Sequence, residues 1–257
     1  MELVLKKPPV YEKDGVPYFG SEEAGDQFDA TDVESWSARF AERWREKGQA
    51  DDYRNAVWMD LCKQAAALNL PVMDIACGPG LGLLPDIYAF NPSMEAVATD
   101  ACPLVVEAWQ RFMKENAPAV NIGFASFDAA NMPLASNSID VMTSHIGFGS
   151  LRRAGADQLD GIREAYRVLK PGGRIFTIEL EFEDRAVIQQ VFDKWGRTNW
   201  FEKDQLTWRE RFESVGFTVA QENFLCRRMP RDWELGDVAA SFGLEIWAVT
   251  KAYVLCK

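Results

Sequence analysis

The stretch that decides the fold reads Val72-Met73-Asp74-Ile75-Ala76-Cys77-Gly78-Pro79-Gly80. It is typical of a short buried strand that carries an acid near its end and runs directly into a glycine turn. Because glycine has no Cβ, such a turn brings backbone N–H groups close to a bound ligand. A glycine turn after a strand is a weak signal alone, so its meaning depends on the sequence that follows it.

Strands and helices alternate after this stretch, which is the pattern of a parallel sheet with helices on both faces. A short helix with Pro85 in its first turn follows the glycines, Pro103 opens the next helix, and another covers 156–169. The predicted strands are 72–76, 96–99, 122–126, 139–144, 174–180, 217–225 and 245–255. We therefore predict an α/β fold with a doubly wound, mostly parallel seven-stranded sheet.

The first 70 residues have a different character. Residues 1–30 show little periodicity, and we expect an irregular leader. A capping-box pattern at Thr31-Asp32-Val33-Glu34 predicts a helix that ends near Gly48, and a second helix is expected from about Asp51. The chain is thus divided into a leader with an N-terminal helical cap over 1–70 and a ligand-binding domain over 71–257, forming one compact unit.

The candidate ligand-binding residues lie at strand ends, where parallel sheets bind their ligands. They are Asp74, Ala76, Gly78, Gly80, Asp100, Ala101, Asp128, Ala129 and Ser144. A carboxylate at Asp100 can accept from both hydroxyls of a ribose, and Asp128 offers an acceptor for an exocyclic amine. The backbone N–H of Ala129 suits a purine nitrogen, and Asp74 suits an ammonium group. Together these groups describe an adenosine-bearing ligand with an amino-acid tail.

Two further motifs separate this ligand from a dinucleotide. Leu83 stands where a GxGxxG motif requires its third glycine, and the fifth strand is preceded by Leu169-Lys170-Pro171-Gly172-Gly173. With these motifs, residues 70–257 resemble the class I S-adenosylmethionine-dependent methyltransferases. The run Glu164–Gly173 is similar to the subfamily related to ubiquinone/menaquinone-biosynthesis methyltransferases.

The resemblance implies S-adenosyl-L-methionine (SAM) as cofactor and S-adenosyl-L-homocysteine (SAH) as product. By it, Asp74, Gly78 and Gly80 cradle the methionyl part, Asp100 holds the ribose, and Asp128 and Ala129 meet the adenine. Structural alternatives remain open, because Asp74 can brace the loop and Asp100 can cap the helix that begins at Pro103. Gly172 and Gly173 are expected to serve the turn alone.

His145 is the only histidine, and it follows the fourth strand directly. It is the candidate catalytic residue, as a general base, and the alternative is a histidine that only shapes the acceptor site. The residues Ser144-His145-Ile146-Gly147 lack the Asn/Asp-Pro-Pro-aromatic motif of amino-methylating nucleic-acid enzymes and the Pro-Cys of cytosine C5 methylation. A small-molecule acceptor is therefore expected.

Composition points the same way. The formal net charge is −11, and an acidic surface repels phosphate backbones, which argues against a nucleic-acid substrate. Five widely spaced cysteines fit neither a metal site nor a disulfide framework. No signal-peptide core or membrane-spanning run is present. We expect a cytoplasmic monomer or homodimer that has no metal site and no membrane partner.

The predicted function is transfer of a methyl group from SAM to a small-molecule acceptor by in-line displacement. The alternatives are a SAM-binding enzyme with non-methyl chemistry and a non-catalytic SAM-binding partner subunit. Trp109 and Trp247 are expected in the core, and Arg152 and Arg153 are expected to be solvated rather than to bind an acidic acceptor. Tryptophans expected to cover the acceptor, or simply to pack their helices, are Trp36, Trp44, Trp195, Trp200 and Trp208.

Overall fold

The computed structural model describes residues 3–20, 30–151, 157–197, 206–230 and 234–257, with backbone only for 30–34 and 36–38. Its elements in chain order are β1 (Tyr11–Lys13), β2 (Val16–Tyr18), α1 (Ala30–Arg45), α2 (Ala56–Ala67), β3 (Val72–Ile75), α3 (Leu84–Phe90), β4 (Ala96–Asp100), α4 (Pro103–Asn116), β5 (Ile122–Ser126), the 3-10 helix η1 (Ala129–Asn131), β6 (Ile139–His145), α5 (Gly147–Ser150), α6 (Gln158–Val168), β7 (Leu169–Phe182), α7 (Arg185–Trp195), α8 (Trp208–Val215), β8 (Thr218–Arg228), α9 (Glu234–Ser241) and β9 (Ala248–Cys256).

The strands form one sheet in the order β1-β2-β5-β4-β3-β6-β7-β9-β8. The run from β5 to β7 is parallel, and β9 and β8 are antiparallel additions at one edge. All seven predicted strands are present, as β3 to β9, so the predicted α/β fold is confirmed. The order reverses at β3, which lies between β4 and β6, and ligands bind at such reversals in open α/β sheets.

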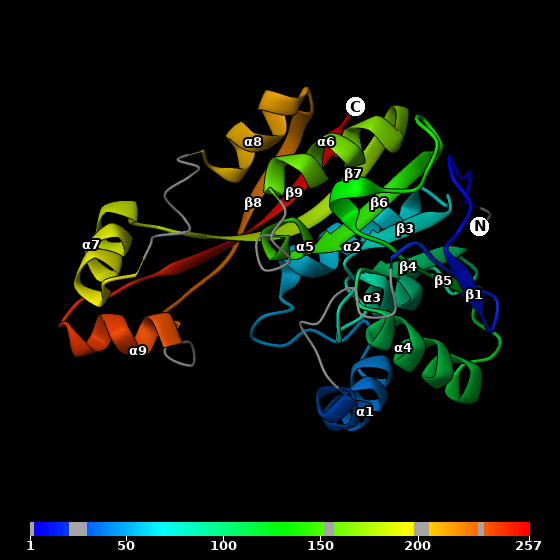
Figure 1. Cartoon of the computed structure of the whole chain (residues 1–257), viewed down its shortest axis with the longest axis horizontal. Coiled ribbons are helices and arrows are strands. Elements are labelled where there is room, and N and C mark those ends of the chain that lie inside the picture. The colour runs from blue at the N-terminus through cyan, green and yellow to red at the C-terminus, as the bar shows by residue number, and fades with distance from the viewer. Residues whose placement is uncertain (1–2, 21–29, 152–156, 198–205, 231–233) are drawn as a thin grey trace.

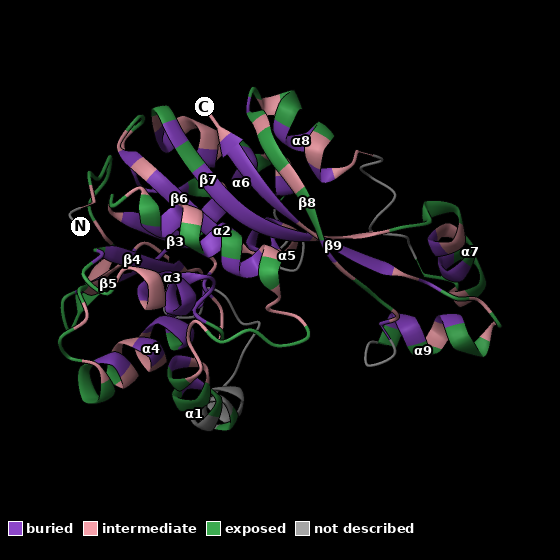
Figure 2. Ribbon diagram, turned by 180° about the vertical axis from the view of Figure 1, so that it is seen from behind, coloured by how far each residue is buried: buried purple, intermediate pink, exposed green. Residues whose placement is uncertain are grey.

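The sheet is buried on both faces, as Figure 2 shows for its central strands. One face packs on α1 to α4, through residues such as Phe40, Trp58 and Trp109. The other packs on α5, α6 and α8, through residues such as Phe148 and Phe212. Continuous apolar strands such as Val72–Ile75 are the sequence consequence of this double burial.

The prediction of an irregular leader is wrong for residues 11–18. They form a β1–β2 hairpin that adds to the edge of β5, with Tyr18 opposite Ser126. Its turn is Asp14-Gly15, where both residues have positive φ, as the common two-residue hairpin turn requires. The Asp-Gly pair between two short alternating runs was the signal available in the sequence. The division of the chain near residue 70 stays a prediction.

Three boundaries differ from those expected. The first cap helix begins at Ala30 and ends at Arg45, with Gly48 in a left-handed turn beyond it. The second begins after Asn55 rather than near Asp51, because Asn55 caps it and accepts from the N–H of Val57. The predicted turn at 170–173 lies inside β7 as a bulge, where the β6–β7 register shifts.

The long strands β7, β8 and β9 continue beyond the body of the protein, as Figure 1 shows. At their far end α7 and α9 pack together around a small apolar cluster that includes Val191, Phe192 and Leu235. The helix α9 was not predicted from the sequence. Within the described part of the chain, no helix is long and apolar enough to cross a membrane.

Candidate active site

The turns that follow β3, β4 and β5 lie side by side at the carboxyl edge of the sheet. Backbone hydrogen bonds join them: the N–H of Cys77 donates to the carbonyl of Thr99 (2.8 Å), and the N–H of Phe127 donates to that of Asp100 (3.1 Å). On the other side of β3, Ile75 pairs with Ser144 of β6. The strand-end residues singled out from the sequence therefore gather around one edge.

Asp100 links two of these turns through its carboxylate. Oδ2 accepts the N–H of Gly78 (2.9 Å), and Oδ1 accepts the N–H of Cys102 (2.9 Å). Burial raises the pKa of Asp100 above its ordinary value, although the N–H groups of Cys102 and Gly78 oppose that shift. Through its bond to Cys102, the residue before α4, Asp100 also caps that helix. The same carboxylate therefore caps α4 with one oxygen and reaches the glycine turn with the other.

Gly78 and Gly80 have open space where a side chain would point. A Cβ at Gly80 would meet no heavy atom within 4 Å, and a Cβ at Gly78 would meet only the carbonyl oxygen of Ala76, at 3.9 Å. Protein packing therefore does not demand a glycine at Gly80. Space beside a glycine turn that bears backbone N–H groups is what a bound cofactor would fill.

Asp74 lies beneath this turn rather than in the open space. Its side chain is fully buried, Oδ2 accepts the hydroxyl of Thr143 (2.5 Å), and a Cβ at Gly82 would lie 2.1 Å from Oδ1. Burial raises the pKa of Asp74 to about 8, while the hydrogen bond from Thr143 opposes the shift. This geometry favours the role of bracing the loop, and direct contact with a cofactor stays a prediction.

The remaining cofactor candidates occupy the neighbouring turns. Asp128 is exposed and accepts the N–H of Ala130 (2.8 Å) at the start of η1, while Ala129 is buried. Ala101 is partly buried directly after Asp100. Their proposed contacts with an adenosine stay predictions, and the structure brings their positions together.

Ser144 and Ala76 meet where β6 leaves the sheet. Ser144 is fully buried, and its Oγ accepts the N–H of Gly147 (3.2 Å). A Cβ at Gly147 would lie 2.3 Å from that Oγ and 3.2 Å from the Cβ of Ala76. Ala76 has a φ of 51°, a left-handed conformation that glycine adopts more readily. Ser144 therefore holds the turn after β6 against the glycine loop.

His145 ends β6 and faces side chains from the N-terminal cap. Its Nε2 lies 3.2 Å from the hydroxyl of Tyr53, and its ring meets the ring of Trp58 edge to face at 4.9 Å. Burial lowers the pKa of His145 to about 4, with Arg43 and Arg228 adding to the shift. The imidazole is therefore neutral near pH 7 and is a weaker base than an ordinary histidine.

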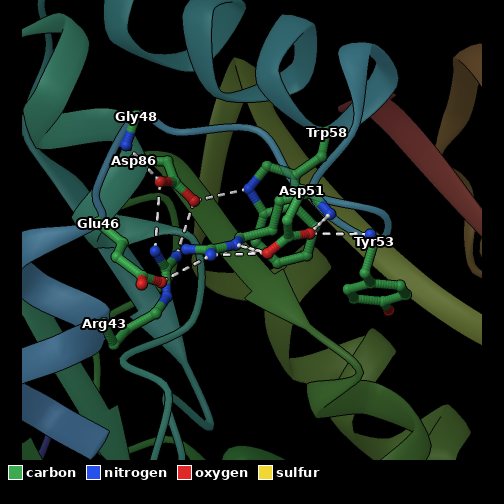
Figure 3. Close-up of polar contacts among 8 residues, drawn as sticks. Arg43, Glu46, Gly48, Asp51, Tyr53, Trp58 and Asp86 are labelled. Atoms are coloured by element: carbon green, nitrogen blue, oxygen red, sulfur yellow. Dashed lines mark hydrogen bonds and ion pairs between the residues drawn. The ribbon is translucent and has the colours of Figure 1, made fainter.

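Asp86 fixes the cap that carries these partners, as Figure 3 shows. It is fully buried on α3 and accepts from Arg43 (3.2 and 2.7 Å), from the N–H of Gly48 (2.7 Å) and from Nε1 of Trp58 (2.7 Å). One carboxylate thus joins α1, the loop after it and α2. An acid inside an apolar helix was the sequence signal for this pairing, because a buried carboxylate requires donors.

The segment between the cap helices is fastened at both ends. Asp51 accepts the N–H groups of Tyr53 (2.8 Å) and Arg54 (2.6 Å). Asn55 caps α2 and donates to the carbonyl of Leu225 on β8 (2.8 Å). Tyr53 is therefore held over the sheet by contacts on both sides, and no local pattern marks it in the sequence.

A second buried acid supports the turn after His145. Glu179 of β7 is fully buried, accepts the hydroxyl of Thr177 (2.9 Å) and accepts the N–H of Gly149 in α5 (3.1 Å). Burial raises the pKa of Glu179 to about 8, and these hydrogen bonds oppose the shift. Sequence reasoning missed this residue, because a strand glutamate usually faces water.

The tryptophans divide between core and surface. Trp109 is core as predicted and stacks on Phe40 with ring centroids 4.0 Å apart. Trp44 and Trp208 are buried, which favours the packing alternative for both. The core prediction for Trp247 is wrong, because this residue is half-buried beneath the guanidinium of Arg227.

The other tryptophans lie away from this site or outside the description. Trp195 packs in the small α7–α9 cluster, at the far end of the long strands. The side chain of Trp36 lies outside the described residues, as do Trp200, Arg152 and Arg153 entirely. Their predicted roles stay predictions.

Comparison with known proteins finds relatives of about half of this chain. A demethylmenaquinone methyltransferase from Lactococcus lactis is 33% identical over 125 residues, which are 49% of this chain and 48% of that protein. A ubiquinone/menaquinone biosynthesis C-methyltransferase from Azotobacter vinelandii is 30% identical over 122 residues, covering 48% and 47%. The chain spans about half the length of the curated relatives it matches.

Solved structures share the fold at low sequence identity. An arsenic(III) S-adenosylmethionine methyltransferase from Chlamydomonas reinhardtii superposes with a TM-score of 0.51 at 18% identity, over 88% of this chain and 73% of that one. The [4+2]-cyclase SpnF superposes with a TM-score of 0.53 at 16% identity, over 82% and 84%. The model of the ubiE/COQ5 methyltransferase family matches residues 48–200, from the loop between α1 and α2 to just beyond α7. The chain belongs to the ubiE/COQ5 methyltransferase family.

Proposed function

We propose that this protein transfers a methyl group from SAM to a small-molecule acceptor. The observation that carries the proposal is the Asp100 carboxylate, which joins the N–H of Gly78 to the N–H of Cys102 beside the open space at Gly80. A carboxylate beside a glycine turn at the reversal of a parallel sheet suits a ligand with ribose hydroxyls. Membership in a methyltransferase family supports the same reading.

The residues present fit such a cofactor. Asp100 would accept from the ribose hydroxyls, the turn at Gly78 and Gly80 would approach the methionyl part, and Asp128 with Ala129 would meet the adenine. When bound, SAM supplies an electrophilic methyl group on a sulfonium. The chain would act mainly by holding the acceptor and the methyl group in line, since alignment of two reactants lowers the activation barrier by up to roughly 7–11 kcal/mol in the best model reactions.

The acceptor belongs on the other side of His145, where Tyr53 and Trp58 face β6. The relatives named above are described as acting in menaquinone and ubiquinone biosynthesis, one of them as a C-methyltransferase. We infer that a ring carbon of a quinone-type molecule is the first acceptor to test. The family match ends at residue 200, so β8 and β9 lie outside it.

Non-methyl chemistry is the second candidate, because the [4+2]-cyclase SpnF has the same fold. Product analysis separates the two. Incubation with methyl-labelled SAM and a demethylated quinol should release SAH and transfer the label to the acceptor. Turnover without release of SAH would instead support non-methyl chemistry.

Asp100→Ala tests the cofactor assignment directly. Hydrogen bonds to a charged group contribute roughly 1.5–3 kcal/mol each, so the dissociation constant for SAH should rise at least about tenfold in calorimetry. Asp140→Ala is the matched control, because Asp140 lies near the start of β6, at the opposite edge of the sheet, and is paired with Lys170. Unchanged affinity in a folded Asp100→Ala variant would refute the assignment.

A further inference from the structure

Thr250 of β9 is a buried hydroxyl beside Tyr53. Its side chain is fully buried, and within the described part of the chain its Oγ1 has no hydrogen-bond partner of normal geometry. The hydroxyl is nevertheless near enough to act on Tyr53 as a donor: burial raises the pKa of Tyr53 to about 12, and Thr250 opposes that shift. A buried hydroxyl without a partner is costly, so a site that keeps one is suited to a ligand oxygen.

The Tyr53–His145 contact has a direction. A phenol is a good donor, and among the described residues its hydroxyl lies 3.2 Å from Nε2 of His145. Both groups are uncharged near pH 7, since the pKa of Tyr53 is about 12 and that of His145 is about 4. The phenol therefore donates to Nε2, and the imidazole carries its proton on Nδ1. The phenolic oxygen keeps a lone pair for another donor.

Charged groups act on this cluster from a distance. Arg43 and Arg228 act on His145, and the charge of Arg43 is balanced by Asp86. On Tyr53 the charged or titratable groups are Cys226, Arg228 and Glu179, whose effects are smaller than burial. The cluster itself thus consists of two hydroxyls and an imidazole, which suit an uncharged ligand oxygen, and a carboxylate or ammonium would find no charged partner within the cluster.

We propose that Tyr53, His145 and Thr250 form the acceptor-binding part of the active site and bind an uncharged oxygen, a hydroxyl or carbonyl, of the acceptor. In this arrangement Thr250 donates to the acceptor oxygen, Tyr53 accepts from an acceptor hydroxyl, and His145 holds Tyr53 in place. The inference rests on the proposed function and names residues for its acceptor side. His145 directly follows Ser144, the partner of Ile75, so the cluster adjoins the cofactor turn.

The first test is nuclear magnetic resonance of histidine labelled with nitrogen-15, in which His145 is the only signal. In the wild-type protein Nδ1 should be protonated and Nε2 unprotonated near pH 7. Tyr53→Phe should shift the imidazole toward the form protonated on Nε2, because no donor then faces that nitrogen. Tyr88→Phe is the matched control, since its buried hydroxyl donates to Asn121 instead, and it should leave the signal unchanged.

The second test uses phenol and benzoate as probes in the presence of SAH. At about 20 mM, above the millimolar range of such small ligands, phenol should shift the His145 signals and benzoate should not. Thr250→Val should weaken phenol binding about 2- to 12-fold, the usual net effect of one hydrogen bond. Thr218→Val, at the exposed start of β8, should have no effect.

The outcomes separate this inference from the proposed function. Failure of the wild-type protein to bind SAH would refute the proposed function itself. Normal SAH binding together with an unchanged His145 signal in Tyr53→Phe would overturn the acceptor site alone. Preference for benzoate, or no response to phenol, would likewise overturn it. SAH affinity retained in both Tyr53→Phe and Thr250→Val shows that the variants fold.

Discussion

The two sides of the candidate active site are built in different ways. The donor side, defined here as Gly78, Gly80, Asp100 and Asp128, comes from successive strand ends, and its main contact joins residues 22 positions apart. The acceptor side, defined as Tyr53, His145 and Thr250, comes from the cap, β6 and β9, and the contact between Tyr53 and His145 spans 92 positions. One side is local in sequence and the other depends on packing.

This difference has a physical cause. Parallel strands place their carboxyl ends at one edge, so the turns of the donor side meet whenever the sheet forms. The acceptor side forms only if α2 is docked over β6 and β9. Changes that release the cap should therefore disturb the acceptor side and leave the donor side nearly intact.

Asp86→Ala should have the largest effect. It removes the carboxylate to which Arg43, Gly48 and Trp58 donate, and removing one partner of a buried ion pair costs about 3–5 kcal/mol. The free energy of unfolding in urea should fall by that amount. The His145 signal should also change, because Trp58 loses the partner that orients it, while SAH affinity should change much less.

Asp60→Ala is the control for this variant, because Asp60 is exposed on α2 and its carboxylate accepts from the side-chain amide of Gln64. Its unfolding free energy should stay within about 0.5 kcal/mol of wild type. If Asp86→Ala weakened SAH binding as strongly as Asp100→Ala does, the two sides would not be independent.

A pair of glycine variants tests the donor side from within. Gly82→Ala places a Cβ 2.1 Å from the carboxylate of Asp74 at a φ of 54°, and should lower the free energy of unfolding by about 2–4 kcal/mol. Gly80→Ala meets open space and should leave stability nearly unchanged while weakening SAH binding. Calorimetry and urea unfolding measure both. Equal loss of stability in the two variants would mean that Gly80 also serves packing.

A single substitution should change the pH dependence of stability least, by about 1.4 kcal/mol per pH unit, and two buried acids contribute to that dependence. Asp74 and Glu179 have folded pKa values near 8, above their ordinary values, so between about pH 5 and 8 the folded state holds protons that the unfolded state has lost. The free energy of unfolding should therefore fall as pH rises, by about 1.4 kcal/mol per pH unit for each group.

Glu179→Gln should remove the share of this slope that comes from the acid beneath the turn after His145, and Asp74→Asn the share that comes from the acid beneath the glycine turn. Urea unfolding at pH 6, 7 and 8 measures the slope for each variant. A slope that is the same in Glu179→Gln as in wild type would show that Glu179 is already ionised when folded.

Much of the fold was predictable because apolar runs and prolines mark its strands and helix starts locally in the sequence. The seven strands β3 to β9 were found from short apolar runs that alternate with helices, and Pro85 and Pro103 marked helix starts correctly. The pair Asp14-Gly15 indicates the turn of the β1–β2 hairpin, even though the residues around it show only weak periodicity. The helix α9 was missed because its apolar face is defined by α7, with which it forms a separate cluster.

The sequence by itself determined the parallel sheet, its glycine turn and the acids that end its strands, since strand patterns and turn residues act over a few positions. It did not distinguish Asp74 as a brace from Asp74 as a ligand contact, and it did not place Tyr53 or Thr250 near His145. Only the tertiary structure placed Asp74 beneath the loop, Tyr53 beside His145 and Thr250 beside Tyr53. Burial and donor geometry depend on which helix packs on which face, and that is a property of the whole chain.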